Sequence, residues 1–385
     1  MEKFKKELMK GNNMAGYIFN IGKDTKVLDI IKQGYYSPLM SDSLSPNPFE
    51  GTFGDFVTMK EGDNVYFFQN RKIYGVGKLY KIGDDCKYNN FIGATSLERF
   101  LYNEIKNTLL IDFGEQSVNY RWICFFNGSP SFYEDGLDMD EVLSYKPDTF
   151  KVLRTNWKRT FIKIDDNENK SLKELFLLRI YNKSNIVELN EKIKLYSPIT
   201  EEHILNPVDL IISTKDKDRL KHEMAIESAT LGKLALYADS IFGKWDYVTH
   251  QLCASPFKPI DYMDKIDIFA YKYIEAYDEK VVSKYMIIEL KKDTATSETI
   301  NQISNYVDYV CKNYAYGDYS LIEAYILAYD FSEDMYTQNA RDSYERTFNI
   351  GAHPIKVLKW NNVKYIKYSI INDDIQYTDV TKKEN

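Results

Sequence analysis

The chain has few residues of the kinds that bind zinc or form disulfides. Its 385 residues include four cysteines and four histidines, and none recur at the CxxC, HxxxH or HEXXH spacing of zinc sites. A zinc ribbon, a disulfide framework and a histidine-based zinc hydrolase are therefore not expected. Long apolar runs are also missing, since no window reaches the roughly 20 apolar residues of a membrane span. The first residues lack the apolar core of a signal peptide, so we expect a protein of the reducing cytoplasm without a membrane partner.

An excess of positive charge is absent as well. The net charge of −7 argues against strong non-specific binding to nucleic acid. An acidic chain can still place catalytic carboxylates beside a local basic groove. Hydrophobic residues make up 44% of the chain and aromatic residues 15%, which is enough to build the cores of two or three domains.

The pattern of apolar residues changes along the chain. Two apolar runs joined by the polar tip Gln69–Lys72 predict a β-hairpin over Gly62–Tyr80. A capping-box pattern, Ser171 with Glu174, predicts a helix that runs to Tyr181. We predict an α/β (α+β) protein with a β-rich domain over residues 15–165, a helical linker over 166–214, and a mixed sheet flanked by helices over 215–385.

The last of these regions alternates helices and strands. The order of elements predicts helices that pack on a mixed sheet. The expected helices cover residues 216–240, 297–311 and 334–347, and the expected strands cover residues 247–253, 265–276, 281–290, 321–331, 355–360 and 364–371.

Charged residues interrupt two of the apolar strands. Asp267 lies in one strand, and Glu289 and Lys291 lie in the next. A buried charge without a partner costs several kcal/mol, so these residues serve a site or lie at a strand end. Glu289 and Lys291 face the same side of their strand. An antiparallel pairing would bring Asp267 and Glu289 within reach of one divalent cation, with the Leu290 carbonyl as a further oxygen.

This pattern resembles the PD-(D/E)XK nuclease superfamily over roughly residues 215–371. Asp267 corresponds to the strand acid and Glu289-Leu290-Lys291 to the E-x-K element. Gln302 and Tyr306, which share a helix face, resemble the Q-x-x-x-Y element of RecB-type and NucS-type nucleases. The chain departs from the pattern because no Pro-Asp pair precedes the strand. Asp261 and Asp264 therefore compete with Asp267, which is preferred for its apolar flanks.

The resemblance implies a role for each matching residue. Asp267, Glu289 and the Leu290 carbonyl would hold Mg²⁺, with Mn²⁺ as a substitute, and Lys291 would position or help deprotonate the attacking water or offset phosphate charge. Family members also carry an acid on the first helix. The candidates are Glu227, as outer-shell or second-metal ligand, and Glu223 one turn earlier. Gln302 would orient a water or a phosphate. Tyr306 and Lys292 are expected contacts to nucleic acid.

The first half resembles PUA-like domains such as EVE and ASCH. Gly62-Asp63-Asn64-Val65 and Tyr74-Gly75-Val76-Gly77 match the ends of two barrel strands in those domains. The resemblance implies a small β-barrel that holds a modified or flipped base in an aromatic pocket. Arg71 and Lys72, at the hairpin tip, are expected to meet phosphates, unless they form an ordinary solvated turn. The candidate pocket residues, which could equally form a core, are Tyr17, Phe19, Tyr35, Tyr36, Trp122, Phe125 and Phe126.

Together these features predict a metal-dependent DNA endonuclease with an N-terminal domain that recognises a modified or unmodified base. Such a combination is typical of a restriction or phage-defence enzyme, and a homodimer would allow both strands to be cut. Two other functions remain open from the sequence: a non-catalytic nucleic-acid-binding protein on a nuclease scaffold, and an RNA-directed nuclease.

Overall fold

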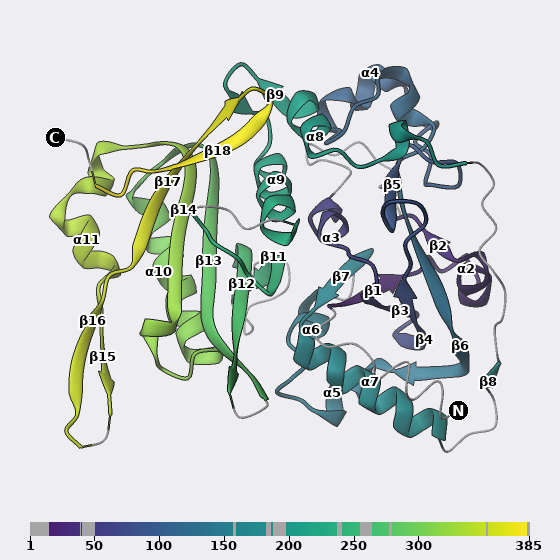
Figure 1. Cartoon of the computed structure of the whole chain (residues 1–385), viewed down its shortest axis with the longest axis horizontal. Helices are drawn as coiled ribbons and strands as arrows, with labels where there is room; N and C mark the ends of the chain where they lie inside the picture. The colour runs from purple at the N-terminus through teal and green to yellow at the C-terminus, as the bar shows by residue number, and fades with distance from the viewer. Residues whose placement is uncertain are drawn as a thin grey trace. The chain divides into compact units, whose positions relative to one another are not determined.

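The chain is a mixed α/β protein that forms two compact units, residues 1–206 and residues 207–385 (Figure 1). The computed structural model describes residues 15–38, 40, 51–156, 159–181, 186–187, 198–236, 241–254, 264–276, 279–351 and 353–382. Within these residues, no helix has both the length and the apolar character needed to span a membrane.

The first unit is built on an eight-stranded sheet. Its strands are β1 (Gly16–Asn20), β2 (Tyr35–Tyr36), β3 (Asn64–Gln69), β4 (Lys72–Leu79), β5 (Lys87–Asn89), β6 (Trp122–Asp138), β7 (Phe161–Ile164) and β8 (Ile186–Val187). Its helices are α2 (Val27–Gln33), α3 (Phe53–Val57), α4 (Tyr102–Ile105), α5 (Met139–Tyr145), α6 (Val152–Asn156) and α7 (Asp166–Tyr181). The strand order is β2-β6-β4-β3-β1-β7, and β5 and β8 also pair with β6.

The expected hairpin is formed by β3 and β4. Its two-residue loop, Asn70 and Arg71, has positive φ values of 50° and 61°, as a type I′ turn requires. Gly77 of β4 pairs with Gly128 of β6. A Cβ at Gly77 would lie only 2.6 Å from the backbone oxygen of Asn127. Glycine is therefore needed here because two strands approach closely, in the middle of a strand.

The second unit is built on a six-stranded sheet with the order β11-β12-β13-β14-β17-β18. These strands are β11 (Tyr247–Cys253), β12 (Lys265–Ala276), β13 (Glu279–Ala295), β14 (Ile322–Phe331), β17 (Val363–Ile371) and β18 (Asp374–Asp379). The helices are α8 (Pro207–Thr214), α9 (Glu223–Leu236), α10 (Ser297–Asn313) and α11 (Gln338–Tyr344). Two small hairpins complete the unit: β9 (Lys215–Asp216) with β10 (Arg219–Leu220), and β15 (Arg346–Ile350) with β16 (Lys356–Trp360).

The directions of the strands determine which strand ends lie at the same edge of this sheet. β12 and β13 are antiparallel, whereas β13, β14 and β17 are parallel to one another. The carboxyl ends of the three parallel strands therefore meet at one edge of the sheet. Helix α9 packs on β11, β12 and β13, and α10 packs on β13 and β14. The apolar residues of α10 lie on one buried side, among them Ile300, Ile303 and Val307.

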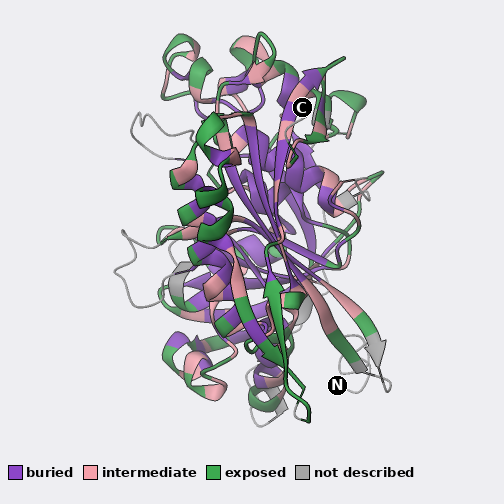
Figure 2. Cartoon of the chain, turned by 90° about the vertical axis from the view of Figure 1, so that its left-hand side faces the viewer, coloured by how far each residue is buried: buried purple, intermediate pink, exposed green. Residues whose placement is uncertain are grey.

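Two expected helices are shorter than the sequence pattern suggested. Residues 215–220 form a hairpin instead of the first turns of a helix, with Lys217 at a φ of 61°. Residues 346–347 belong to β15, where they pair with β16. At its other end, α11 begins only after Thr337, whose hydroxyl accepts a hydrogen bond from the Ala340 amide. The central strands are buried, while the β15–β16 hairpin is largely exposed (Figure 2).

The close approach at Gly77 yields a stability prediction. Gly77→Ala should lower the free energy of unfolding by about 1–3 kcal/mol, because the added methyl group forces β6 away from β4. Urea denaturation followed by tryptophan fluorescence measures the change. Glu61→Ala, at an exposed position, is the control and should change stability by less than about 0.5 kcal/mol. Equal midpoints for Gly77→Ala and the unaltered chain would contradict the prediction.

Candidate active site

The pairing of β12 with β13 brings the two predicted strand acids together. Ile268 pairs with Ile288, so Asp267 and Glu289, one residue outside this pair, lie side by side. Asp267 Oδ2 accepts a hydrogen bond of 2.7 Å from the Leu290 amide. This bond holds the Asp267 carboxylate against the backbone between Glu289 and Lys291, and it places the Leu290 peptide beside both acids.

Glu289 and Lys291 form an ion pair on the same face of β13. The Lys291 ammonium lies 2.6 Å from Glu289 Oε1, and the Glu289 side chain is only 1% exposed. The second oxygen, Glu289 Oε2, is buried and no amide, ammonium or hydroxyl group of the described residues donates to it, while the neighbouring Asp267 carboxyl hydrogen-bonds to the Glu289 side chain when it is protonated. A buried carboxylate oxygen without a donor costs free energy, unless a ligand satisfies it.

The charges in this cluster shift one another's protonation. Burial and the negative charges of Glu289 and Glu227 raise the pKa of Asp267 well above its usual range. Burial also raises the pKa of Glu289, although Lys291 opposes the shift. Burial alone would lower the pKa of Lys291, but the Glu289 carboxylate outweighs this effect and leaves the Lys291 pKa raised. The lysine therefore stays a cation at neutral pH, while two neighbouring carboxylates resist being ionised together.

Both candidate acids of the first helix lie near the cluster, in different settings. Glu227 is buried, and its Oε1 lies 3.2 Å from Nδ1 of His250, a buried residue on β11. Glu223 is exposed, and its Oε1 accepts a long hydrogen bond of 3.4 Å from the Lys292 amide. The charge of Glu223 acts on Glu289 and Lys291, and that of Glu227 acts on Asp267.

The predicted Q-x-x-x-Y pair is formed on α10. Gln302 Nε2 donates a 2.9 Å hydrogen bond to the Tyr306 hydroxyl. Tyr306 is 3% exposed, and burial together with the charge of Glu289 raises its pKa. The ring is therefore part of the interior beside the carboxylates, where it holds Gln302 in place, and it offers no exposed surface to a nucleic acid.

The strand next to Asp267 is irregular. The register of β11 with β12 is the same on both sides of this point, from His250–Ile268 to Leu252–Ile266, but the opposed residues Gln251 and Asp267 form no ladder pair, and Gln251 has a φ of 54°. Of the competing acids, Asp264 is exposed at the start of β12, and its carbonyl accepts a hydrogen bond from the Ala254 amide. Asp261 lies outside the described residues.

The expected phosphate-binding cations are exposed to different degrees. Arg71 is paired with Asp140 at 2.6 Å, and the Lys72 ammonium donates to the Asp135 carbonyl at 3.0 Å. The Lys292 side chain is 48% exposed and lies 3.9 Å from Asp293. Lys292 is therefore the predicted cation that lies beside the carboxylates.

The seven aromatic candidates for a base pocket are all in the core of the first unit. Their exposure ranges from 0% to 9%. They pack on one another and on neighbouring rings: Phe19 stacks on Tyr36 at 5.2 Å, and Trp122 lies 4.6 Å from Phe56. The sequence left open whether these rings line a pocket or form a core. Their contacts are those of a core, since no ring of this set faces solvent.

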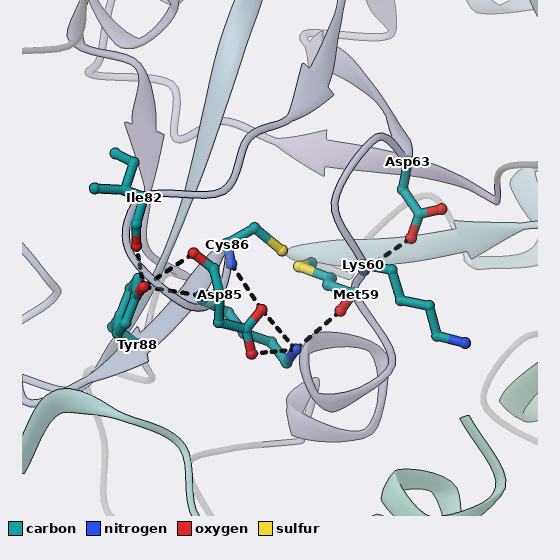
Figure 3. Close-up of polar contacts among 8 residues, drawn as sticks. Met59, Lys60, Asp63, Ile82, Asp85, Cys86 and Tyr88 are labelled. Carbon is teal, nitrogen blue, oxygen red and sulfur yellow. Dashed lines mark hydrogen bonds and ion pairs between the residues drawn. The ribbon is translucent and has the colours of Figure 1, made fainter. Parts of the chain in front are cut away.

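A second charged cluster, in the first unit, surrounds Asp85 (Figure 3). The buried Lys87 ammonium donates to both carboxylate oxygens of Asp85 and to the Met59 carbonyl, at 2.9–3.1 Å. The Tyr88 hydroxyl contacts the carbonyls of Ile82 and Asp85. The three donors of an ammonium group are thus used inside the protein, and the cluster joins the residues before β5 to the loop before β3.

The donor set of the β12–β13 cluster suits a hard cation. Across the described ranges, no group of three or more His, Cys, Asp or Glu side chains is arranged to hold a metal ion. Asp267 and Glu289 are two, and Mg²⁺ is commonly bound by one or two carboxylates with waters in its remaining positions. The unsatisfied Glu289 Oε2 and the adjacent Leu290 peptide fit such an ion.

His250 and Gln251 lie beside the predicted acids Glu227 and Asp267 but were not among the predicted site residues. Both lie within the apolar run Tyr247–Cys253, and the buried histidine was the available signal, since a polar residue in an apolar strand needs a partner. The positive φ of Gln251 had no sequence signal, because glutamine rarely adopts that conformation.

Comparison with known proteins gives loose similarities. Neither a protein-family model nor a curated protein matches the chain. A repair endonuclease from Pyrococcus abyssi aligns at 19% identity and a TM-score of 0.19, over 32% of this chain and 43% of its own. A hypothetical protein from Leishmania major aligns at 13% identity and a TM-score of 0.26, over 43% and 94% of the two chains. The Pho92 YTH domain in complex with m6A aligns at 9% identity and a TM-score of 0.24, over 47% and 93%. The chain spans less than half of the endonuclease, and TM-scores this low assign neither fold nor activity.

The raised pKa values predict how stability depends on pH. A carboxyl group whose folded pKa is raised destabilises the fold as pH rises above its unfolded pKa, and this cost is absent below about pH 4, where both states are protonated. Asp267→Asn should therefore raise the thermal midpoint at pH 8 in chelator, by about 2–4 °C for each kcal/mol relieved. The gain should shrink towards pH 4.

The matched control for this measurement is Asp293→Asn. It makes the same chemical change on the neighbouring strand β13, at a side chain that is 56% exposed, and should move the midpoint little. A lower midpoint for Asp267→Asn at pH 8 would show that the aspartate charge is not a source of instability.

Proposed function

We propose that the chain is a metal-dependent endonuclease that hydrolyses phosphodiester bonds in DNA. One observation supports the proposal: paired neighbouring strands hold two buried acids, Asp267 and Glu289, and the cation Lys291 together at one place. A structural ion pair needs one acid and one base. A second acid beside the pair raises the cost of burial, and a divalent cation offsets that cost.

In this proposal Asp267, Glu289 and the Leu290 carbonyl would hold one Mg²⁺, with Mn²⁺ as a substitute. When bound, the ion supplies Lewis-acid polarisation of a phosphoryl oxygen and lowers the pKa of a bound water. The hydrogen bond from the Leu290 amide to Asp267 fixes the carboxylate before the ion arrives. The chain therefore presents an ordered pair of acids to the ion.

Lys291 serves as a cation in the proposed reaction. Its pKa is raised by Glu289, so it keeps its proton at neutral pH and is poorly suited to act as a base. An ammonium at this position offsets the charge that develops on the phosphate and orients the attacking water through its N–H groups. The ion pair with Glu289 holds the ammonium at the site.

Glu223, Glu227 and Gln302 surround this centre. Glu223 is exposed beside the E-x-K element and suits a role as outer-shell acid or ligand of a second ion. Glu227 is held by His250 and acts on Asp267 through its charge. Gln302, restrained by Tyr306, would orient a water or a phosphate.

In this proposal the first unit selects the DNA that is cut, as the recognition domain of a restriction or phage-defence enzyme does. A hydrolase that cuts DNA in a cell needs such selection. The test of this role is a comparison of phage DNA with and without modified bases.

The decisive experiment is digestion of plasmid DNA, phage DNA of both kinds, and RNA, each with Mg²⁺ and with chelator. We expect DNA to be cut only with the metal. Glu289→Gln and Lys291→Met should each lower the rate by at least about 100-fold, because one removes a negative ligand and the other removes the cation.

Lys284→Met is the matched control, since it removes a lysine from the same strand whose ammonium donates to the Ser320 carbonyl. It should retain cleavage. Preferential cutting of RNA would redirect the proposal to an RNA-directed nuclease, and the absence of cutting for every substrate and metal would overturn it.

A further inference from the structure

Two lysines stand in one row across the parallel part of the second sheet. Lys291 of β13 pairs with Ala328 of β14, and Ala328 pairs with Lys367 of β17. Residues in register on parallel strands point to the same side of a sheet, and adjacent strands lie about 4.8 Å apart. The backbone positions of Lys291 and Lys367 are therefore separated by about 10 Å, with only a small alanine side chain between them.

The ring of Tyr329, which follows Ala328 and so projects from the opposite face at the end of β14, contacts two cations. The guanidinium of Arg219, on β10, lies 4.9 Å from the centre of the Tyr329 ring, and the Lys367 ammonium lies 5.7 Å from it. The Tyr329 hydroxyl donates a hydrogen bond to Asp218, which anchors the β9–β10 hairpin to the end of β14. Cation–π contacts of this kind hold side chains in place without neutralising their charge.

The same edge is joined to the candidate active site. Tyr329 packs edge-to-face on Tyr368, with ring centres 5.9 Å apart. The Tyr368 hydroxyl donates a 2.8 Å hydrogen bond to the carbonyl of Lys292, the residue after Lys291. We name Arg219, Lys292 and Lys367 the cationic edge.

The acids that face the cationic edge hold it only weakly. Arg219 lies 2.9 Å from Asp293, with side chains 43% and 56% exposed, and Lys367 lies 3.1 Å from Asp330, with side chains 42% and 55% exposed. Ion pairs exposed to this extent contribute about 0–1 kcal/mol. A phosphate group can therefore replace the carboxylates at little cost, with the cations already held in position by the Tyr329 ring.

We propose that the cationic edge binds the phosphodiester backbone of the substrate as it leaves the cleavage site. This inference rests on the proposed nuclease function and deepens it, because it gives the path of the strand: from Lys291 across the ends of β14 and β17. Contacts to phosphates are independent of base sequence and position the substrate.

The test measures how DNA binding by the full-length chain depends on salt. Fluorescence anisotropy of a labelled duplex of about 20 base pairs, in chelator and over a potassium chloride series, gives the slope of log K against log salt. Each phosphate contact contributes about 0.9 to this slope for duplex DNA. Arg219→Gln with Lys367→Gln should therefore weaken binding at every salt concentration and reduce the slope by about 1.8.

Lys359→Gln is the matched control. Lys359 is 69% exposed and paired with Glu345, and it lies on β16, whose last residue, Trp360, bonds to the first residue of β14 at the opposite end of the strand. This variant should leave the slope unchanged. Thermal midpoints of all variants are measured alongside, to show that the exposed substitutions keep the fold.

The outcomes separate this inference from the proposed function. An unchanged slope for the double variant, or no binding by the unaltered chain at low salt, overturns the inference, and an intact Mg²⁺-dependent cleavage assay would then leave the nuclease proposal standing. A reduced slope in the double variant alone supports the cationic edge. A reduced slope in a chain that cuts no nucleic acid overturns the proposed cleavage activity and leaves a backbone-binding surface.

Discussion

The antiparallel register of β12 and β13 is the constraint on which the candidate site depends. It sets Asp267 beside Glu289 and lets the Leu290 amide bond to the Asp267 carboxylate at 2.7 Å. A slip of one residue would turn Asp267 to the other side of the sheet, because successive side chains of a strand alternate. The apolar neighbours Ile266, Ile268, Ile287 and Ile288 are all fully buried, and such a slip would exchange the side chains that pack on the two covered faces of the sheet.

The site is held in a state that is unfavourable without a ligand. Two neighbouring carboxyl groups have raised pKa values because they are buried and close to other carboxylates. The surrounding sheet, with its buried aliphatic strands, tolerates this local cost because hydrophobic burial elsewhere exceeds it. Lys291 reduces the cost through its pair with Glu289, and a divalent cation would reduce it further. Stored electrostatic free energy of this kind is common at functional sites.

The parallel strands give the site its surroundings. Because β13, β14 and β17 run in the same direction, their carboxyl ends collect charged and aromatic residues at one edge, which is where open α/β sheets commonly bind ligands. In the first unit, charged groups have another use. The Lys87 ammonium is fully bonded to Asp85 and Met59, so its charge joins loops together and is not offered to a ligand.

The positions of Asp267, Glu289 and Lys291 within buried strands could be predicted from the sequence, because a charge in an apolar run is visible without a structure. The same is true of the hairpin of β3 and β4 and the apolar side of α10, since both follow from local periodicity. The surroundings of Glu223 and Glu227 could not be predicted, because His250, the residue that contacts Glu227, lies on a different element of the fold, β11, and is brought to α9 by packing. The role of the aromatic residues in the first unit could not be predicted either. A ring that packs in a core and a ring that lines a binding pocket look alike in a sequence, and only their packing distinguishes them.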